Sequence, residues 1–229
     1  RVSYAGGYRA PQAFDEDMHI AIVVGKRVRI RLADDLREER SHSVSLSADL
    51  YHTFGKVQTN LLVEGFYTIL DDVFALRDMD DAADGGKVKE RYNGSGATVR
   101  GFNVEGRAAF TRWFELQAGV TLQQSRYKEP EFWSEDAEVP PVRRMFRTPD
   151  AYGYFTASFK PVRNFTADLS GTCTGSMLVQ HMAGSGVAQD VAVSTPSFFD
   201  MNIRLSYDGS IYKEINIQLY GGRQNPFNA

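Results

Sequence analysis

The side chains best suited to holding a metal or a metal chelate lie in two polar segments. These side chains are Asp15, Asp17, Met18, His19, His181 and Met182. Carboxylate, imidazole and thioether groups are ligands for iron, copper and haem, so the two segments are candidate ligand-binding loops. The alternative is that they are ordinary solvated loop residues, or that they bind divalent ions that bridge lipopolysaccharide, because ligand type without geometry does not define a site.

A third polar segment, residues 128–150, combines aromatic and basic side chains. Tyr127 and Trp133 stand at its start, and Arg143, Arg144 and Arg147 follow. Aromatic faces and guanidinium groups suit anionic or aromatic chelates. A positively charged rim beside anionic lipid head groups explains the same residues equally well.

The chain contains none of the motifs that indicate catalysis. Gly94-Ser95-Gly96 and Gly184-Ser185-Gly186 lack the strand-to-helix context of a nucleophile elbow, and neither a phosphate-binding loop nor zinc-ligand spacing occurs. We therefore predict that the protein is not an enzyme, with no cofactor and no structural metal. A net charge of -3 excludes the strongly basic surface of a nucleic-acid-binding protein.

The elements that position these residues are predicted from a two-residue alternation of apolar and polar side chains. From Ser41 to Phe54, for example, Val44, Leu46 and Ala48 alternate with serines. Such alternation is typical of a strand with one wet and one apolar face. We predict strands over 1–9, 41–54, 57–71, 88–94 with 97–110 as one long interrupted strand, 114–127, 151–160, 164–178, 197–207 and 211–222.

The connections between these strands alternate in length. Short turns are predicted at 55–56, 111–113, 161–163 and 208–210, and long polar loops at 10–40, 72–87, 128–150 and 179–196. This organisation is typical of outer-membrane barrels, in which short periplasmic turns alternate with long outer loops. We expect an all-β, antiparallel up-and-down meander that forms an open, partial transmembrane β-barrel.

A soluble β-sandwich is the alternative fold, because its strands alternate as well. Sandwich strands usually run about five or six residues, whereas several segments here exceed the length needed to cross a bilayer at a tilt. No run of about 18 apolar residues exists, so the sequence excludes a transmembrane helix. The two folds differ in one testable respect: only the sandwich buries its leucines against a second sheet.

Four short stretches resemble sequence motifs of TonB-dependent outer-membrane receptors. The motifs are most similar to those of receptors of the Bacteroidetes type. They are Gly7-Tyr8-Arg9-Ala10-Pro11 at a strand end, the run from Ala33 to Ser41, Asn93-Gly94-Ser95-Gly96-Ala97 followed by Gly101 to Gly106, and Gln224 to Ala229. In the second stretch Arg37 stands where the family usually has proline. They are distributed from Gly7 to Ala229, so the resemblance spans almost the full chain.

The resemblance implies that residues 1–229 are the C-terminal part of a barrel of about 22 strands, truncated at both ends. Nine strands, without the plug domain and the TonB-contacting box, are expected here. The implied function is part of an active transporter that binds a scarce metal chelate, meaning a siderophore, haem or cobalamin, on its extracellular loops and imports it with energy from TonB. A passive porin or structural barrel is the alternative.

The resemblance also gives a role to charged side chains that we place on the polar faces of the strands. These are Glu64, Arg100, Glu105, Arg107, Glu115, Asp168, Asp200 and Arg204. In an intact receptor they would line the lumen and contact the plug through salt bridges and hydrogen bonds. Mutual pairing inside the lumen, with no role in transport, is the alternative. The expected location is the outer membrane of a Gram-negative bacterium, with membrane lipid and TonB as partners.

Overall fold

A computed structural model describes residues 1–11, 28–79, 87–134, 136, 138–184, 186–212 and 215–226. Its largest unit is a curved sheet whose wall contains nine strands in the order β1-β3-β4-β7-β8-β10-β11-β14-β15. Their bounds are β1 Val2–Arg9, β3 Glu39–Phe54, β4 Val57–Asp71, β7 Ala97–Thr111, β8 Phe114–Glu131, β10 Ala151–Phe159, β11 Phe165–Thr174, β14 Phe198–Tyr212 and β15 Ile215–Gln224. Every neighbouring pair in this wall is antiparallel.

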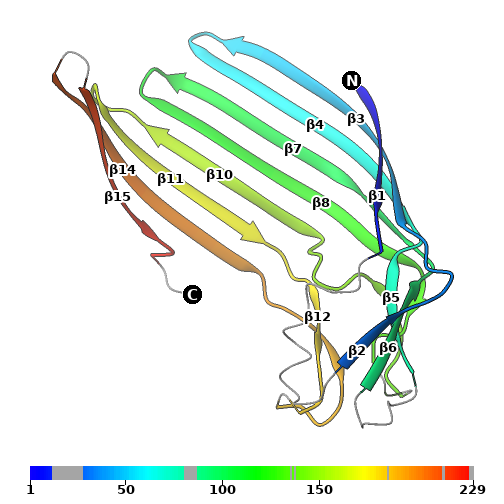
Figure 1. Ribbon diagram of the computed structural model, residues 1–229. Coiled ribbons are helices and arrows are strands. Elements are labelled where there is room, and N and C mark those ends of the chain that lie inside the picture. Colours follow the sequence, from blue (N-terminus) through cyan, green and yellow to red (C-terminus); the bar gives the residue numbers. More distant parts are fainter. Residues whose placement is uncertain are drawn as a thin grey trace.

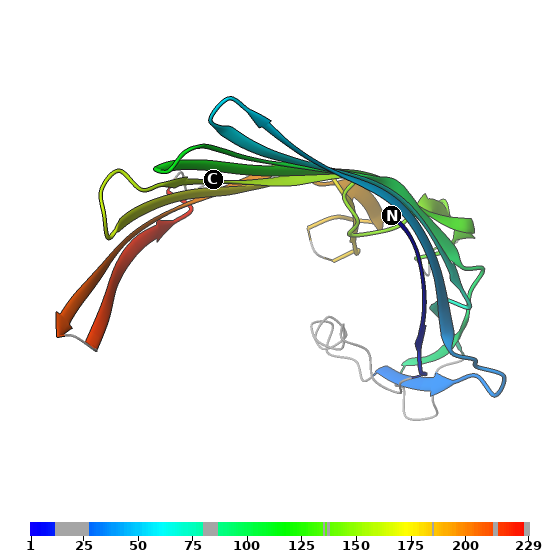
Figure 2. The same ribbon diagram turned by 90° about the horizontal axis from the view of Figure 1, so that it is seen from above.

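The wall is an open arch and not a closed barrel (Figures 1 and 2). β1 and β15 form its two edges, because neither pairs with the other. The predicted all-β meander of about nine strands and its open, curved form are therefore confirmed. The described residues contain no helix that is long and apolar enough to cross a membrane.

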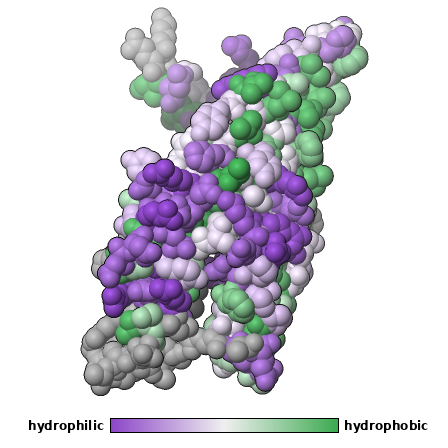
Figure 3. Space-filling model, turned by 90° about the vertical axis from the view of Figure 1, so that its right-hand side faces the viewer, coloured by the Kyte–Doolittle hydropathy of each residue, from purple (hydrophilic) through white to green (hydrophobic). Residues whose placement is uncertain are grey.

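Pairing register assigns every wall residue to one of two faces. Phe102 lies opposite Leu122, Leu169 opposite Ile203, and Tyr207 opposite Leu219, so these side chains share the face that we call the outer face. Leu46 and Leu219 are 64% and 65% exposed there. Figure 3, a view of one side of the molecule, shows hydrophobic residues gathered in its upper part and hydrophilic residues below them.

The other, concave face carries polar residues and is called the lumen face. Gln117 lies opposite Arg107, and Asp168 opposite Arg204, as the alternation predicts. Among the described residues, Ala33 and Ala97 are the hydrophobic residues that are buried. A sheet with so little apolar core and so many exposed leucines is inconsistent with a soluble sandwich and fits a surface that meets lipid.

Arg100 is an exception among the predicted lumen residues, and that prediction is wrong. Arg100 lies opposite Tyr67 on one side and Gln124 on the other, and it shares the outer face with Phe102. A charge is tolerated there because Arg100 is close to the loop end of β7, next to Thr98, where the apolar face gives way to polar residues.

Aromatic side chains gather at the end of the wall that carries the short turns. Phe114 lies 5.4 Å from Phe110 and 6.0 Å from Phe159, and Trp113 lies 5.1 Å from Phe159, all measured between ring centroids. Amphipathic and aromatic rings of this kind form the interfacial girdles of membrane barrels. The turn end of the sheet therefore has the composition of a membrane–water boundary.

Short strands build the opposite, loop end, and of these only β6 was among the predicted strands, as residues 88–94. β2 Val28–Leu32, β6 Lys87–Asn93 and β5 Phe74–Asp78 form a three-stranded sheet in which β2 and β6 are parallel. β12 Leu178–His181 pairs with β13 Val191–Ser194, and β9 Val142–Arg144 pairs with β8. Figure 1 shows β2, β5, β6 and β12 projecting from one end of the wall.

Three predicted element boundaries are wrong. Residues 88–94 and 97–110 do not form one interrupted strand, because β6 leaves the wall and only β7 belongs to it. The segment 164–178 ends as a wall strand at Thr174. The turn predicted at 208–210 lies inside β14, which continues to Tyr212 with a register shift between Ser210 and Tyr212.

Candidate functional site: a pocket between three loops

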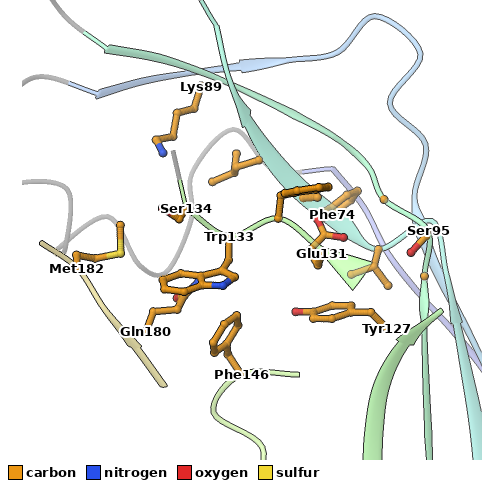
Figure 4. Close-up of a pocket in the computed structure, with 16 residues that line it drawn as sticks. Phe74, Lys89, Ser95, Tyr127, Glu131, Trp133, Ser134, Phe146, Gln180 and Met182 are labelled. Carbon is orange, nitrogen blue, oxygen red and sulfur yellow. The ribbon is translucent and has the colours of Figure 1, made fainter. Parts of the chain in front are cut away.

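A pocket of about 330 Å³ opens at the loop end of the wall (Figure 4). It is formed by the segment that contains β5 and β6, by the segment that follows β8, and by the β12–β13 hairpin. Its lining residues are Val73, Phe74, Ala75, Leu76, Lys89, Gly94, Ser95, Gly96, Tyr127, Glu131, Phe132, Trp133, Ser134, Phe146, Gln180 and Met182.

The floor of the pocket depends on the connection between β6 and β7, where the chain bends at Ser95. Gly96 has a φ of 85°, a left-handed conformation that L side chains rarely adopt, and a Cβ there would meet the Leu70 carbonyl oxygen. The backbone N–H of Lys128 donates to the Gly96 carbonyl over 3.0 Å, and the N–H of Glu129 donates to the Ser95 hydroxyl over 3.3 Å. These bonds attach the β6–β7 connection to the loop end of β8.

The three-stranded loop sheet is attached to the wall at the same place. Asn93 accepts a hydrogen bond from the Arg37 N–H over 2.8 Å, and its amide donates to the carbonyls of Arg37 and Asp72. The Arg37 guanidinium also pairs with the Asp72 carboxylate at 2.7 Å. The segment before β3 and the segment after β4 are thereby joined into one unit.

The opposite side of the pocket is an aromatic pair supported by the β12–β13 hairpin. Trp133 and Phe146 meet edge to face with ring centroids 5.5 Å apart. The Asp190 carboxylate accepts hydrogen bonds from the Ser134 hydroxyl and the Ala183 N–H, each over 2.7 Å. These two bonds hold the pKa of Asp190 below its usual value, and they tie the hairpin to the segment after β8.

The charged groups in the described lining are one lysine and one glutamate, Lys89 and Glu131. Glu131 lies at the loop end of β8, beyond the apolar part of the outer face, and burial raises the pKa of its carboxyl. The indole Nε1 of Trp133 is buried and has no hydrogen-bond partner among the described residues. The pocket thus offers aromatic surface, a carboxyl whose pKa is raised by burial, and an indole donor without a partner among the described residues.

The structure brings together three of the predicted ligand-binding residues. Tyr127, Trp133 and Met182 line the pocket, and Figure 4 shows Trp133 between Phe146 and Gln180 on one side and Tyr127 and Glu131 on the other.

The remaining predicted ligand-binding residues do not line the pocket or cannot be placed. Arg143 donates to the Lys128 carbonyl, the backbone N–H of Arg147 donates to Leu178, and His181 is exposed on β12. Asp15, Asp17, Met18 and His19 lie outside the described residues. Among the residues that the structure describes, no group of three or more His, Cys, Asp or Glu side chains could hold a metal ion.

Sequence reasoning missed Phe74, Lys89, Glu131, Phe146 and Gln180. The first two are on the loop sheet, which lies outside the wall, so the alternation along the wall strands did not indicate which way their side chains point. One usable signal existed: Gly94-Ser95-Gly96, noted for its resemblance, stands at the floor of this pocket.

The other seven predicted lumen residues lie on the lumen face, where Arg107 and Glu115 bond to each other and Glu105 and Asp168 bond to neighbouring polar side chains. Gln117 donates to Glu105 over 2.8 Å and to the Tyr154 hydroxyl over 3.2 Å. Arg107 pairs with Glu115 at 2.5 Å, and Ser158 donates to Asp168 over 2.6 Å. Register also places Glu64, Asp200 and Arg204 on this face, and Arg204 lies over the Tyr220 ring at 4.9 Å.

Comparison with known structures identifies the architecture. The ferric-catecholate import receptor Fiu from K12 E. coli matches with a TM-score of 0.61 at 13% identity over 100% of this chain and 28% of that one. The FrpB iron transporter from Neisseria meningitidis (F3-3 variant) matches with a TM-score of 0.63 at 15% identity, over 100% of this chain and 32% of that one. The siderophore receptor PirA from Pseudomonas aeruginosa matches with a TM-score of 0.64 at 11% identity, over 100% and 36% respectively.

The chain therefore spans about a third of the length of these receptors. No curated protein sequence matches it. The family model described as "TonB dependent receptor-like, beta-barrel" matches residues 1–225. TonB-dependent receptors are transporters of the Gram-negative outer membrane and not enzymes. An antiparallel wall with a lipid-compatible outer face, a polar lumen face and a pocket between its long loops agrees with that match, and the chain belongs to the TonB-dependent receptor β-barrel family.

Proposed function

We propose that residues 1–229 form part of an outer-membrane receptor that binds a metal chelate in the loop pocket and imports it with energy from TonB. The observation that carries the proposal is the position of the pocket, which lies between three long loops at the loop end of a wall of this family. In such barrels the long loops are extracellular, so a ligand that arrives from outside meets the pocket before the lumen.

The chemistry of the pocket narrows the class of chelate. Phe74, Trp133 and Phe146 present aromatic surface, and Lys89 is the cation of the described lining. A highly anionic chelate would be repelled by the Glu131 carboxylate without a cluster of arginines to offset it. We therefore propose a chelate that inserts an aromatic or otherwise weakly charged part. The similar receptors named above include a ferric-catecholate importer and a siderophore receptor, which supports iron as the metal.

The proposal assigns energy coupling to parts of the receptor other than this chain. A plug domain and its TonB-contacting segment would meet the lumen face, where Glu105, Asp168 and Arg204 offer charged groups. The proposal also places the protein in the outer membrane of a Gram-negative bacterium, with lipid around the outer face.

The test uses the intact receptor in its host and radiolabelled ferric siderophores, haem and cobalamin as probes. Trp133→Ala should weaken binding of the transported chelate by about 10- to 100-fold, as expected for a buried aromatic contact. The matched control Trp113→Ala, at the turn end, should leave affinity unchanged. Uptake should stop when the proton-motive force is dissipated. Unchanged affinity in the Trp133 variant would move recognition away from this pocket, and uptake without that force would indicate a passive porin.

A further inference from the structure

A second pocket, of about 650 Å³, opens at the turn end of the wall, at the opposite end from the loop pocket. It lies between the turn that joins β7 to β8 and the turn that joins β10 to β11 (Figure 1). The first turn contributes Arg112 and Trp113 to its lining, and the second contributes Lys160, Val162 and Arg163. We call it the turn pocket.

Main-chain hydrogen bonds hold the two turns in place around the turn pocket. The backbone N–H of Lys160 donates to the Trp113 carbonyl over 2.7 Å, which joins the two turns. On the other side, the N–H of Asp208 on β14 donates to the Asn164 carbonyl over 2.8 Å. Asn164 has a φ of 70°, in the left-handed region where asparagine is among the commoner non-glycine residues. The backbone therefore fixes the turn pocket from both sides.

Three cations at the turn pocket have no anionic partner. Arg112, Lys160 and Arg163 are exposed, and none of them forms a salt bridge with any residue that the structure describes. The carboxylate of the described lining, Asp208, lies on the lumen face and accepts a hydrogen bond from the Gln218 side chain over 2.8 Å. An anion in the turn pocket would be attracted by all three cations.

The turn pocket also borders the aromatic end of the outer face. Trp113 meets Phe159 with ring centroids 5.1 Å apart. Phe165, in the lining, lies opposite Tyr207 on the outer face, and Val162 is 64% exposed. An amphipathic ligand can place its apolar chains against these side chains while its anionic group meets the cations. A soluble anion would leave the apolar border unused.

We propose that the turn pocket binds the phosphate of an anionic glycerophospholipid from the periplasmic leaflet of the outer membrane. The short turns of such barrels face the periplasm, so the turn pocket lies at the level of the head groups of that leaflet. Lysine and arginine beside a membrane attract anionic lipid, and guanidinium groups bind phosphate through two parallel hydrogen bonds. The phosphate meets Arg112, Lys160 and Arg163. The acyl chains lie on Trp113 and Phe159. The site does not depend on which chelate the receptor transports.

The test uses the intact receptor purified in detergent, with dioleoyl phosphatidylglycerol as the probe and native mass spectrometry as the readout. The double variant Arg112→Gln/Arg163→Gln should bind the lipid about tenfold or more weakly than wild type, because the phosphate loses charge-assisted hydrogen bonds. Lys56→Gln is the matched control, since Lys56 is an exposed cation in the β3–β4 turn, outside the turn pocket. This variant should bind as wild type does. Heat-modified mobility on a gel verifies that each variant is folded.

Dioleoyl phosphatidylcholine has the same acyl chains and a zwitterionic head group, so it should bind wild type about tenfold or more weakly than phosphatidylglycerol does. Equal binding of the two lipids would show that acyl chains alone are recognised, and it would overturn the proposal. Equal affinity of the double variant and the wild type would overturn it as well. Displacement of the lipid by an equal concentration of glycerol phosphate would make the turn pocket a site for a soluble anion. Uptake of the chelate by the double variant should match wild type, because the loop pocket is at the other end of the wall.

Discussion

Glu131 is the pocket residue whose protonation should affect the structure around it. Burial raises the pKa of its carboxyl, so the folded loops bind this proton more tightly than the unfolded chain does. The resulting stabilisation is complete below the usual glutamate pKa of 4.5 and is lost as the pH rises through the higher, folded pKa. At neutral pH the buried carboxylate therefore lowers the stability of the folded loops. A ligand that donates a hydrogen bond to this carboxylate would reduce the loss of stability.

Replacing Glu131 by glutamine should remove this pH dependence. The fluorescence of Trp133 is obtained by subtracting the emission of the Trp133→Phe variant from that of the wild type. In the wild-type receptor it should change as the pH is raised above 4.5. The Glu131→Gln variant should show none, because the amide does not titrate. Glu129→Gln, two residues away and exposed, is the control and should titrate as wild type does. An unchanged titration in Glu131→Gln would assign the transition to another group.

At the scale of elements, the loops are held by a small number of contacts that alternation along the sequence does not reveal. Gly96 lies in the connection between β6 and β7 in a left-handed conformation that suits glycine, and Asp190 ties the β12–β13 hairpin to the segment after β8. Each contact can be removed without touching the wall strands.

Gly96→Ala should destabilise the loop end by about 1–3 kcal/mol, because the new Cβ meets the Leu70 carbonyl and the backbone is in a left-handed conformation. The measurement is the shift in the urea midpoint of the intact receptor. Gly106→Ala is the matched control: a Cβ at Gly106 has open space, so its midpoint should be unchanged or slightly higher. Equal midpoints for the two variants would show that the close approach of Gly96 to the Leu70 carbonyl is not as described.

Asp190→Ala should release the β12–β13 hairpin, because the Ala183 N–H and the Ser134 hydroxyl lose their acceptor. Limited proteolysis within residues 175–197 should become faster at neutral pH. In the wild type the pKa of Asp190 is depressed, so its carboxylate stays charged at pH values below the usual aspartate pKa of 3.8. Protection of the hairpin from proteolysis should therefore persist down to pH 3.8 and be lost only at lower pH. Protection of the wild type that disappears already at pH 5 would contradict this.

At the scale of the whole molecule, the wall was largely predictable and the loop end was not. Lipid on one side and water on the other impose a strict two-residue period, so Leu46, Leu122 and Ile203 could be assigned to one face from the sequence. Loop strands such as β6 do not lie between lipid and water. The neighbouring charged residues Glu90 and Arg91 are both buried there, so the polarity of a residue does not indicate which face of the strand it is on. Their pairing depends on contacts between distant segments.

Two particular errors show where the sequence signal ends. Arg100 was assigned to the lumen because of its charge, although its position in the alternation with Phe102 indicates the outer face. Asp208-Gly209-Ser210 has turn composition but pairs with β15, because the register shift between Ser210 and Tyr212 lets β14 continue. Of the candidate site, Tyr127, Trp133 and Met182 were found by residue type alone, whereas the contribution of β5 required the fold.

A charge at the middle of the outer face should destabilise the barrel in the membrane. Ile203 stands midway along the apolar run of β14, so Ile203→Arg should cost about 2–4 kcal/mol. Thr172→Arg places the same charge on the lumen face and is the control, with little expected loss. Folding yield into lipid vesicles as a function of urea measures both. Similar losses at the two positions would remove the distinction between the faces.

The central claim is that one face of this wall meets lipid and the other meets the polar lumen. Spin labels attached singly to the intact receptor in liposomes, at positions 199–207 of β14 with Cys173 replaced by alanine, test it most directly. We expect oxygen, which concentrates in lipid, to relax labels at Phe199, Met201, Ile203, Leu205 and Tyr207, and a water-soluble nickel chelate to relax those at the alternate positions. A profile without that two-residue alternation, or with its phase reversed, would show that the outer face does not meet lipid.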